Sequence, residues 1–179
     1  MKILYFPGIR SIIDKDYDLA MSCKLVHLKE ISECDVYDYH TYELNRALKE
    51  TEKYDALFGS SFGGFFAFNL ALRTGKKCIC VNPSLYLDKR VSTLIAENPD
   101  RLSFLKTLHL SELIAQPSKP EVSNIHVLMN MDDDVLNAEK ILSIARIHHT
   151  NTYAFEKGGH DSTNFIGEML PLIKLILAD

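Results

Sequence analysis

The 179-residue chain lacks the features that mark secreted, membrane-spanning or nucleic-acid-binding proteins. Its N-terminus reads MKILYFPG, and the apolar residues before Pro7 are too few for the core of a signal peptide. The most apolar stretch, residues 56–72, is interrupted by Gly59, Gly63 and Gly64 and falls short of the roughly 18 to 20 apolar residues of a membrane span. The formal net charge is -4, and basic residues do not cluster as phosphate neutralisation requires. We therefore expect a cytoplasmic protein with no membrane span and no nucleic-acid partner.

Cysteine, glycine and proline are also scarce. The four cysteines, at positions 23, 34, 78 and 80, have no zinc-site spacing, and a strand would place Cys78 and Cys80 on one face. We expect all four to be reduced core residues. With 8 glycines, 6 prolines and no repeat or low-complexity tract, the composition is that of an ordinary globular protein. The length favours a single domain, residues 1–179.

Short apolar runs alternate with segments of helical periodicity, which predicts a parallel sheet with crossover helices, an α/β fold. The six predicted strands are residues 2–6, 34–39, 54–58, 78–82, 125–131 and 152–156. Apolar stripes predict half-exposed helices around Leu44 and around Ile141, whereas the helix after Ser61 is apolar nearly all round and should be buried, with Gly75 capping its C-terminus. The last segment predicts an apolar helix with Pro171 in its first turn.

One connection, residues 84–121, exceeds the usual crossover length and contains at least two short helical patterns. We interpret it as a helical cap that covers a functional site. The alternative is an ordinary crossover connection with additional short helices. Five of its apolar residues could line an acyl pocket, but core packing is the favoured interpretation because apolar residues at helical spacing are usually core. These residues are Tyr86, Phe104, Leu105, Leu108 and Leu110.

The stretch ALFGSSFGGFFAF places a Gly-x-Ser-x-Gly pentad, centred on Ser61, between a predicted strand and a predicted helix. A nucleophilic serine on a sharp strand-to-helix turn needs small neighbours, and Gly59, Gly63 and Gly64 provide them. The helix N-terminus would leave the backbone N–H of Phe62 free to donate to an oxyanion. A glycine-rich turn with an inert serine is the alternative, but the context favours a nucleophile.

A nucleophilic serine needs a base, and the base needs an orienting acid. Asp132, Asp133 and Asp134 follow the fifth predicted strand, and His160 follows the sixth. Both positions are at carboxyl ends of strands, where open α/β sheets bind ligands, and the order Ser, Asp, His is that of the α/β-hydrolase fold. One aspartate suffices to orient His160, and the three could instead form a solvated loop with a helix N-cap. Structural or surface roles are expected for His27, His40, His109, His126, His148 and His149.

A second oxyanion donor normally comes from the loop after the first strand, here FPGIRS. The N–H of Ile9 is the candidate, with Gly8 permitting the turn. A simple strand-terminating Pro-Gly turn is the alternative.

Several of these motifs together resemble the small bacterial α/β-hydrolases of the YqiA/YcfP-like esterase family. The resemblance rests on the opening strand with PGIRS, on GSSFGGFFA, on VNPSL, on DDVL and on GGH. It implies Ser61 as nucleophile, His160 as base, Asp133 rather than Asp132 as the acid, and Ile9 and Phe62 as oxyanion donors. Pro7 departs from the family, which usually has histidine there, and makes the geometry of the Ile9 amide less certain.

Together these features predict a serine esterase or thioesterase that acts on a small-molecule acyl substrate through an acyl-enzyme and requires no metal or organic cofactor. An acyltransferase using the same residues is one alternative. A non-catalytic binding protein that has kept the fold is another, since fold does not fix function. Acyl chain length and oligomeric state stay open.

Overall fold

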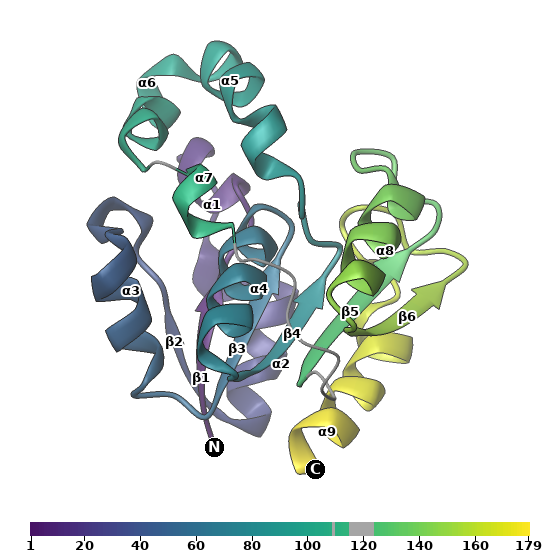
Figure 1. Cartoon of the computed structure of the whole chain (residues 1–179). Coiled ribbons are helices and arrows are strands. Elements are labelled where there is room, and N and C mark those ends of the chain that lie inside the picture. Colours follow the sequence, from purple (N-terminus) through teal and green to yellow (C-terminus); the bar gives the residue numbers. More distant parts are fainter. Residues whose placement is uncertain (109, 115–123) are drawn as a thin grey trace.

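The computed structural model describes residues 1–108, 110–114 and 124–179. Its centre is a six-stranded sheet with the order β2-β1-β3-β4-β5-β6, in which every neighbouring pair is parallel (Figure 1). The strands are β1 (Lys2–Phe6), β2 (Glu33–Val36), β3 (Ala56–Ser60), β4 (Lys77–Val81), β5 (Ile125–Asn130) and β6 (Asn151–Phe155). This is the parallel α/β architecture that the alternating apolar runs predict.

Two of the predicted strands differ from the observed ones by two or three residues at one or both ends, and the others agree to within one residue. β2 ends at Val36 instead of residue 39, because Asp38 accepts a hydrogen bond from the backbone N–H of His40 (3.0 Å) and starts a short helical turn. β3 extends to Ser60, which pairs with Val81 of β4. Because β3 continues to Ser60, it ends immediately before Ser61.

Helices cover both faces of the sheet, which gives three layers (Figure 1). One apolar cluster joins β1, β3, β4 and β5 to α3, α4 and α8, and a second joins the opposite face to α2 and α9. The helices are α1 (Arg10–Ile13), α2 (Cys23–Ile31), α3 (Leu44–Thr51), α4 (Phe62–Thr74), α5 (Leu87–Glu97), α6 (Pro99–Leu102), α7 (Leu110–Leu113), α8 (Ala138–Ile147) and α9 (Leu170–Ala178).

The buried helix α4 follows its apolar sequence. Ten consecutive residues from Phe62 to Ala71 are buried, and Gly75 ends the helix in the left-handed conformation (φ 71°) that glycine adopts at little cost.

Pro171 is in the first turn of α9, where a missing backbone N–H costs no helical hydrogen bond. In the described ranges no helix is long and apolar enough to cross a membrane.

Helices α5, α6 and α7 follow β4 and form the described part of the predicted cap; residues 109 and 115–121 of that segment lie outside the described residues. Figure 1 places α5 and α6 beyond the carboxyl ends of the strands. Leu105, Leu108 and Leu110 are buried in the same apolar cluster as α4. Arg73 of α4 also donates hydrogen bonds to the carbonyl oxygens of Leu113 (3.1 Å) and Glu112 (2.6 Å). Leu105, Leu108 and Leu110 therefore serve as core, and the hydrogen bonds of Arg73 attach α7 to α4.

The four cysteines are free thiols, and Cys34, Cys78 and Cys80 are buried. The expectation that all four are core residues is wrong for Cys23, which is exposed because it begins α2 at the surface. Cys78 and Cys80 lie on the same face of β4, with their sulfur atoms 3.6 Å apart, and both are buried. Burial, together with the neighbouring thiol, raises the pKa of Cys78 well above its usual value. A buried thiol with a raised pKa is a poor nucleophile, so these cysteines act as small core residues.

Candidate active site

Ser61 is the single residue between β3 and α4. Its backbone conformation (φ 50°, ψ -117°) is one that residues other than glycine rarely adopt. Three backbone hydrogen bonds hold it there. Its N–H donates to the carbonyl oxygen of Val81 (3.1 Å), and its own carbonyl accepts from Gly64 (3.0 Å) and Ser84 (2.8 Å). Strain of this kind costs about 1 to 3 kcal/mol and persists where the surrounding structure imposes it. The turn holds the hydroxyl at the carboxyl edge of the sheet.

The glycines of the pentad are required by close backbone packing. A Cβ atom on Gly63 would overlap the carbonyl groups of Phe6 and Pro7, and one on Gly64 would overlap Pro83. A Cβ on Gly59 would come within 2.7 Å of Ala67. The glycine spacing around Ser61, from which the sequence predicts a nucleophile turn, is thus the spacing that close packing of α4 on β1 and β4 requires.

Ser61, His160 and Asp133 come together in one hydrogen-bonded chain. The Ser61 Oγ and His160 Nε2 atoms are 2.7 Å apart, and His160 Nδ1 is 2.8 Å from Asp133 Oδ2. The Asp133 side chain is fully buried, and that of His160 is 18% exposed. The carboxylate leaves Nδ1 as the donor, so Nε2 is the acceptor for the serine proton.

The Asp133 carboxylate is held on both oxygens. Its Oδ1 accepts hydrogen bonds from the backbone N–H groups of Val135 (2.9 Å) and Leu136 (2.7 Å), while Oδ2 faces the imidazole. Burial alone would raise the pKa of this carboxyl, but the hydrogen bonds from His160 and the two amides outweigh it and hold the pKa below its usual value. Asp133 is therefore ionised near neutral pH.

The neighbouring aspartates contact the backbone of the histidine loop. Asp132, the alternative acid, accepts from the N–H groups of Gly159 (2.8 Å) and Gly158 (3.3 Å). Asp134 accepts from the backbone N–H of His160 at 3.4 Å. Of the three consecutive carboxylates, Asp133 is the one that meets the imidazole ring, and the other two hold the loop that carries it.

Asn82 is a site residue that reasoning from the sequence did not single out. Its side-chain N–H₂ group donates to the carbonyl oxygens of Gly159 (2.9 Å) and His160 (3.1 Å) and to the Ser162 hydroxyl (3.1 Å). Its Oδ1 accepts from the backbone N–H of Asn130 (2.8 Å). Asn82 is itself in the left-handed region (φ 42°), directly after β4, where asparagine is tolerated better than most residues. The Asn-Pro pair after β4 is the sequence signal that could have identified it.

The two expected oxyanion donors lie beside Ser61. Ile9 and Phe62 both line the cavity at the serine, and within the described ranges neither backbone N–H has an acceptor in the protein. The loop that carries Ile9 is fixed in spite of Pro7, because the buried Tyr39 hydroxyl donates to the Pro7 carbonyl oxygen (2.7 Å). A Ser11 hydroxyl bond to the Gly8 carbonyl (2.8 Å) fixes it further. Both amides are thus available to a ligand.

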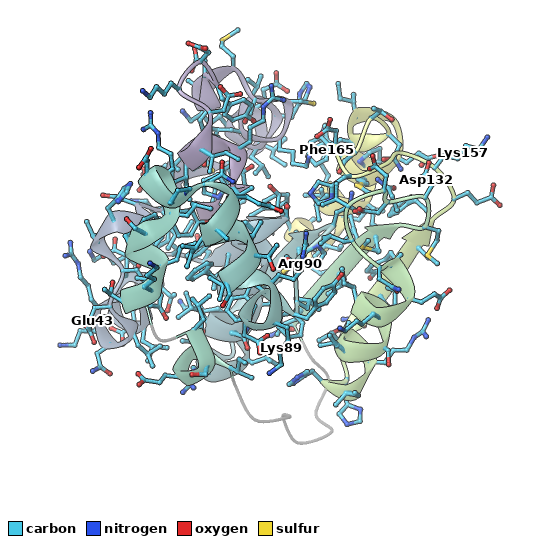
Figure 2. All side chains as sticks on the ribbon, turned by 90° about the horizontal axis from the view of Figure 1, so that it is seen from above. Glu43, Lys89, Arg90, Asp132, Lys157 and Phe165 are labelled. Atoms are coloured by element: carbon cyan, nitrogen blue, oxygen red, sulfur yellow. The ribbon has the colours of Figure 1, made fainter. Side chains whose placement is uncertain are left out.

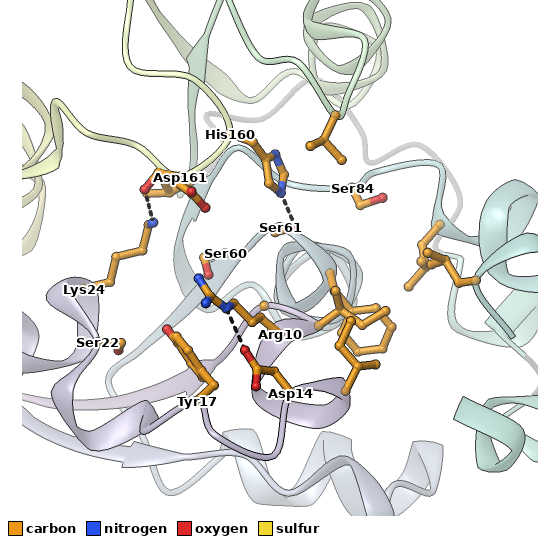
Figure 3. A pocket seen from close by; sticks show the side chains of 18 of the residues that line it. Arg10, Asp14, Tyr17, Ser22, Lys24, Ser60, Ser61, Ser84, His160 and Asp161 are labelled. Atoms are coloured by element: carbon orange, nitrogen blue, oxygen red, sulfur yellow. Dashed lines mark hydrogen bonds and ion pairs between the residues drawn. The ribbon is translucent and has the colours of Figure 1, made fainter. Parts of the chain in front are cut away.

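A cavity of about 630 Å³ opens on this group (Figure 3). Its apolar lining includes Ile9, Ile13, Leu87, Leu94 and Val135. The residues that α5 contributes are Leu87, Arg90 and Leu94, one face of that helix, whereas the five cap residues considered from the sequence do not line it. A cavity of this size suits a small organic ligand.

The other histidines in the described ranges lie outside the cavity lining, and they are His27, His40, His126, His148 and His149. His126 contacts the Tyr153 hydroxyl (3.2 Å), His27 contacts Glu30 (2.8 Å), and His40 and His148 pack against Phe104 and Phe68 respectively. Burial lowers the pKa of His126 and of His148. His109 lies outside the described residues. Across the described ranges no group of three or more His, Cys, Asp or Glu side chains is arranged to hold a metal ion.

Residues 18–177 match the model of the uncharacterised protein family UPF0227. The chain belongs to this family. UPF0227 is the YqiA/YcfP-like family that its motifs resemble. No curated protein matches the chain significantly.

Solved structures similar to this UPF0227 member are α/β-hydrolases. Est1E from Butyrivibrio proteoclasticus has a TM-score of 0.66 at 11% identity, with 99% of this chain and 86% of that chain covered. The Pyrococcus furiosus esterase Pf2001 has a TM-score of 0.57 at 15% identity, covering 99% and 82%. The type II thioesterase BorB from the borrelidin biosynthetic cluster has a TM-score of 0.55 at 15% identity, covering 98% and 92%. At these identities the similarity establishes the fold.

Proposed function

We propose that this protein is a serine hydrolase that cleaves carboxylic esters or thioesters through an acyl-enzyme. The observation that carries the proposal is the chain of short contacts from Ser61 Oγ through His160 to the buried Asp133 carboxylate, placed at a cavity with two unused backbone amides. A strained serine with a base in hydrogen-bond contact is the arrangement that activates a hydroxyl for acyl transfer. The esterase and thioesterase neighbours have the same fold and support this reaction class.

The reaction has two halves. Ser61 Oγ attacks the acyl carbon while its proton moves to His160 Nε2, and the carbonyl oxygen, now negative, accepts hydrogen bonds from the amides of Phe62 and Ile9. The tetrahedral intermediate collapses, the bond to the leaving alcohol or thiol breaks, and His160 gives that group the proton. Water then attacks the acyl-serine with His160 as base, and the acid is released as Ser61 regains its proton. Asp133 holds the imidazole in the required tautomer throughout.

The test is covalent labelling of the folded protein with a fluorophosphonate probe. We expect the wild-type protein to be labelled, the Ser61→Ala variant to give no labelled peptide, and the His160→Ala variant to react far more slowly. Ser143→Ala, at an exposed position of α8, is the matched control and should be labelled like the wild type. A folded wild-type protein that resists the probe would favour a non-catalytic role for the fold.

The Asn82 side chain should matter to the rate although it does not touch the acyl group. Asn82→Ala removes every hydrogen bond that the side chain gives to the histidine loop. We expect kcat for a p-nitrophenyl ester to fall by about 100-fold, because small displacements of a catalytic group cost on this order. We also expect unfolding free energy to fall by roughly 1 to 3 kcal/mol, measured by urea denaturation. Asn45→Ala, on the exposed surface of α3, is the control, and a kcat within twofold of wild type would contradict the prediction.

A further inference from the structure

Lys24 is placed where a lysine is electrostatically unfavourable. It is the second residue of α2, at the helix end whose dipole disfavours cations, and it is half-buried. In the described part of the chain no carboxylate lies within 4.0 Å of its ammonium. Burial lowers its pKa, although the nearby Asp161 partly opposes this. Lys24 therefore carries its charge at this position without a carboxylate partner in the described residues.

Lys24 lines the cavity, and its ammonium group has N–H donors without a partner in the described residues. One N–H donates to the backbone carbonyl of Asp161 (3.1 Å), and the group lies 5.7 Å from the centre of the Phe165 ring. An ammonium has three N–H donors, so two have no partner in the described residues. Figure 3 shows Lys24, Ser60 and Tyr17 around the same space next to Ser61.

The charges of the other cavity-lining residues also favour an anionic ligand. Its lining contains the cations Arg10, Lys24 and Arg90 and the carboxylates Asp14 and Asp161, an excess of positive charge in a protein of formal charge -4. Arg10 is paired with Asp14 (3.1 Å). Asp161 meets Lys24 only through its backbone oxygen, and its side chain is exposed to solvent, which weakens its field.

The two sides of the cavity differ in chemistry. In Figure 3 the side chains without nitrogen or oxygen gather on the side of Ser61 away from Lys24. The apolar lining, which includes Leu87 and Leu94, suits a hydrocarbon chain, whereas the Lys24 side offers an ammonium and hydroxyl groups. A substrate whose reacting carbonyl lies at Ser61 would therefore extend in both directions.

We propose that Lys24 binds an anionic group, a carboxylate or a phosphate, of the acyl substrate whose hydrocarbon part packs against α5. This rests on the proposed function of Ser61. The protein is then selective for amphipathic acyl compounds that carry a negative charge a short distance from the reacting carbonyl. The anion belongs either to the leaving group or to the acyl part, since both extend from the same carbon.

Three thioesters distinguish these two sources. Hexanoyl-N-acetylcysteamine is neutral, hexanoyl-3-mercaptopropionate carries a carboxylate on the leaving group, and the adipoyl monothioester of N-acetylcysteamine carries one on the acyl part. We expect kcat/KM for one of the charged thioesters to exceed that for the neutral one by about 10- to 100-fold, the usual effect of a charge-assisted hydrogen bond. Lys24→Met should remove this preference, and Lys24→Arg should restore most of it.

The competing explanation is that Lys24 only tethers the Asp161 segment next to His160. A tether predicts that Lys24→Met slows all three thioesters equally, whereas an anion subsite predicts a selective loss for the charged one. Equal loss, or no preference for either charged thioester in the wild type, would overturn the proposal.

Binding gives a test that needs no hydrolysis. Hexyl phosphate should bind the wild-type protein more tightly than 1-hexanol by calorimetry, with the difference lost in Lys24→Met. If no thioester is cleaved but this difference is found, the proposed reaction fails while the anion subsite stands. If both alcohol and phosphate bind equally, the subsite fails whatever the protein hydrolyses.

Discussion

The Ser61→Ala change is expected to lower kcat for ester hydrolysis by about a million-fold. Adding His160→Ala to this variant should lower kcat almost no further. In the proposed reaction the two side chains act as a unit, since the proton of Ser61 Oγ would move to the His160 Nε2 atom 2.7 Å away. Under this mechanism, removing either group leaves only substrate binding and the proposed oxyanion donors, the amides of Phe62 and Ile9. In serine hydrolases these remaining features retain about 1,000- to 10,000-fold catalysis over water. The measurement is kcat for p-nitrophenyl hexanoate with each single variant and the double variant.

Ser143→Ala, exposed on α8, is the control for a serine-to-alanine change and should leave kcat unchanged. Additive losses in the double variant would mean that Ser61 and His160 act independently, which is incompatible with proton transfer between them. A Ser61→Ala variant with more than a hundredth of the wild-type kcat would assign the nucleophile elsewhere.

The strands and the serine turn could be predicted from the sequence because each depends on local patterns. Buried parallel strands are short apolar runs, and all six runs correspond to strands to within a few residues. The turn at Ser61 needs glycine where α4 approaches β1 and β4, so its glycine spacing follows from packing. The contacts that require these glycines come from Phe6, Pro7 and Pro83, which are distant in sequence, but the resulting Gly-x-Ser-x-Gly spacing is visible within one short stretch.

The cavity lining could not be predicted in the same way. All four of Leu87, Leu94, Leu105 and Leu108 are apolar residues of one segment and belong to or pack against one apolar cluster, but only Leu87 and Leu94 also line the cavity. Their periodicity is similar, and the difference arises from how α5 is oriented over the sheet. The role of Asn82 likewise depends on β4 lying next to β5, so that one side chain reaches a loop about 80 residues away.

The assignment of the acid among three consecutive aspartates also depends on geometry that the sequence does not display. The turn after β5 directs Asp133 inward, where the side chain is fully buried, while Asp132 and Asp134 remain exposed. The resemblance to UPF0227 members indicated Asp133, but the residues alone left Asp132 open. A turn shifted by one residue along the chain would instead direct Asp132 toward His160.

The difference between the buried Asp133 and the exposed Asp132 leads to the second prediction of a large loss in kcat. It can be measured by replacing each aspartate with the isosteric asparagine. In Asp133→Asn, one oxygen can still accept from Val135 and Leu136, but an amide N–H₂ replaces the carboxylate oxygen that faces His160 Nδ1. The imidazole then favours the tautomer with hydrogen on Nε2, which cannot accept the Ser61 proton. We expect kcat to fall by about 10,000-fold, the cost of this change in a serine protease.

Asp132→Asn is the matched control, because it makes the same chemical change one residue earlier. Its amide oxygen can still accept from the Gly159 N–H, so the histidine loop keeps its main contact and kcat should fall by no more than a few-fold. Circular dichroism and urea denaturation of both variants would separate a tautomer effect from unfolding. Equal losses in the two variants would show that the carboxylates act through the overall charge of the loop. A large loss confined to Asp133→Asn would assign the orientation of His160 to the one carboxylate in contact with its ring.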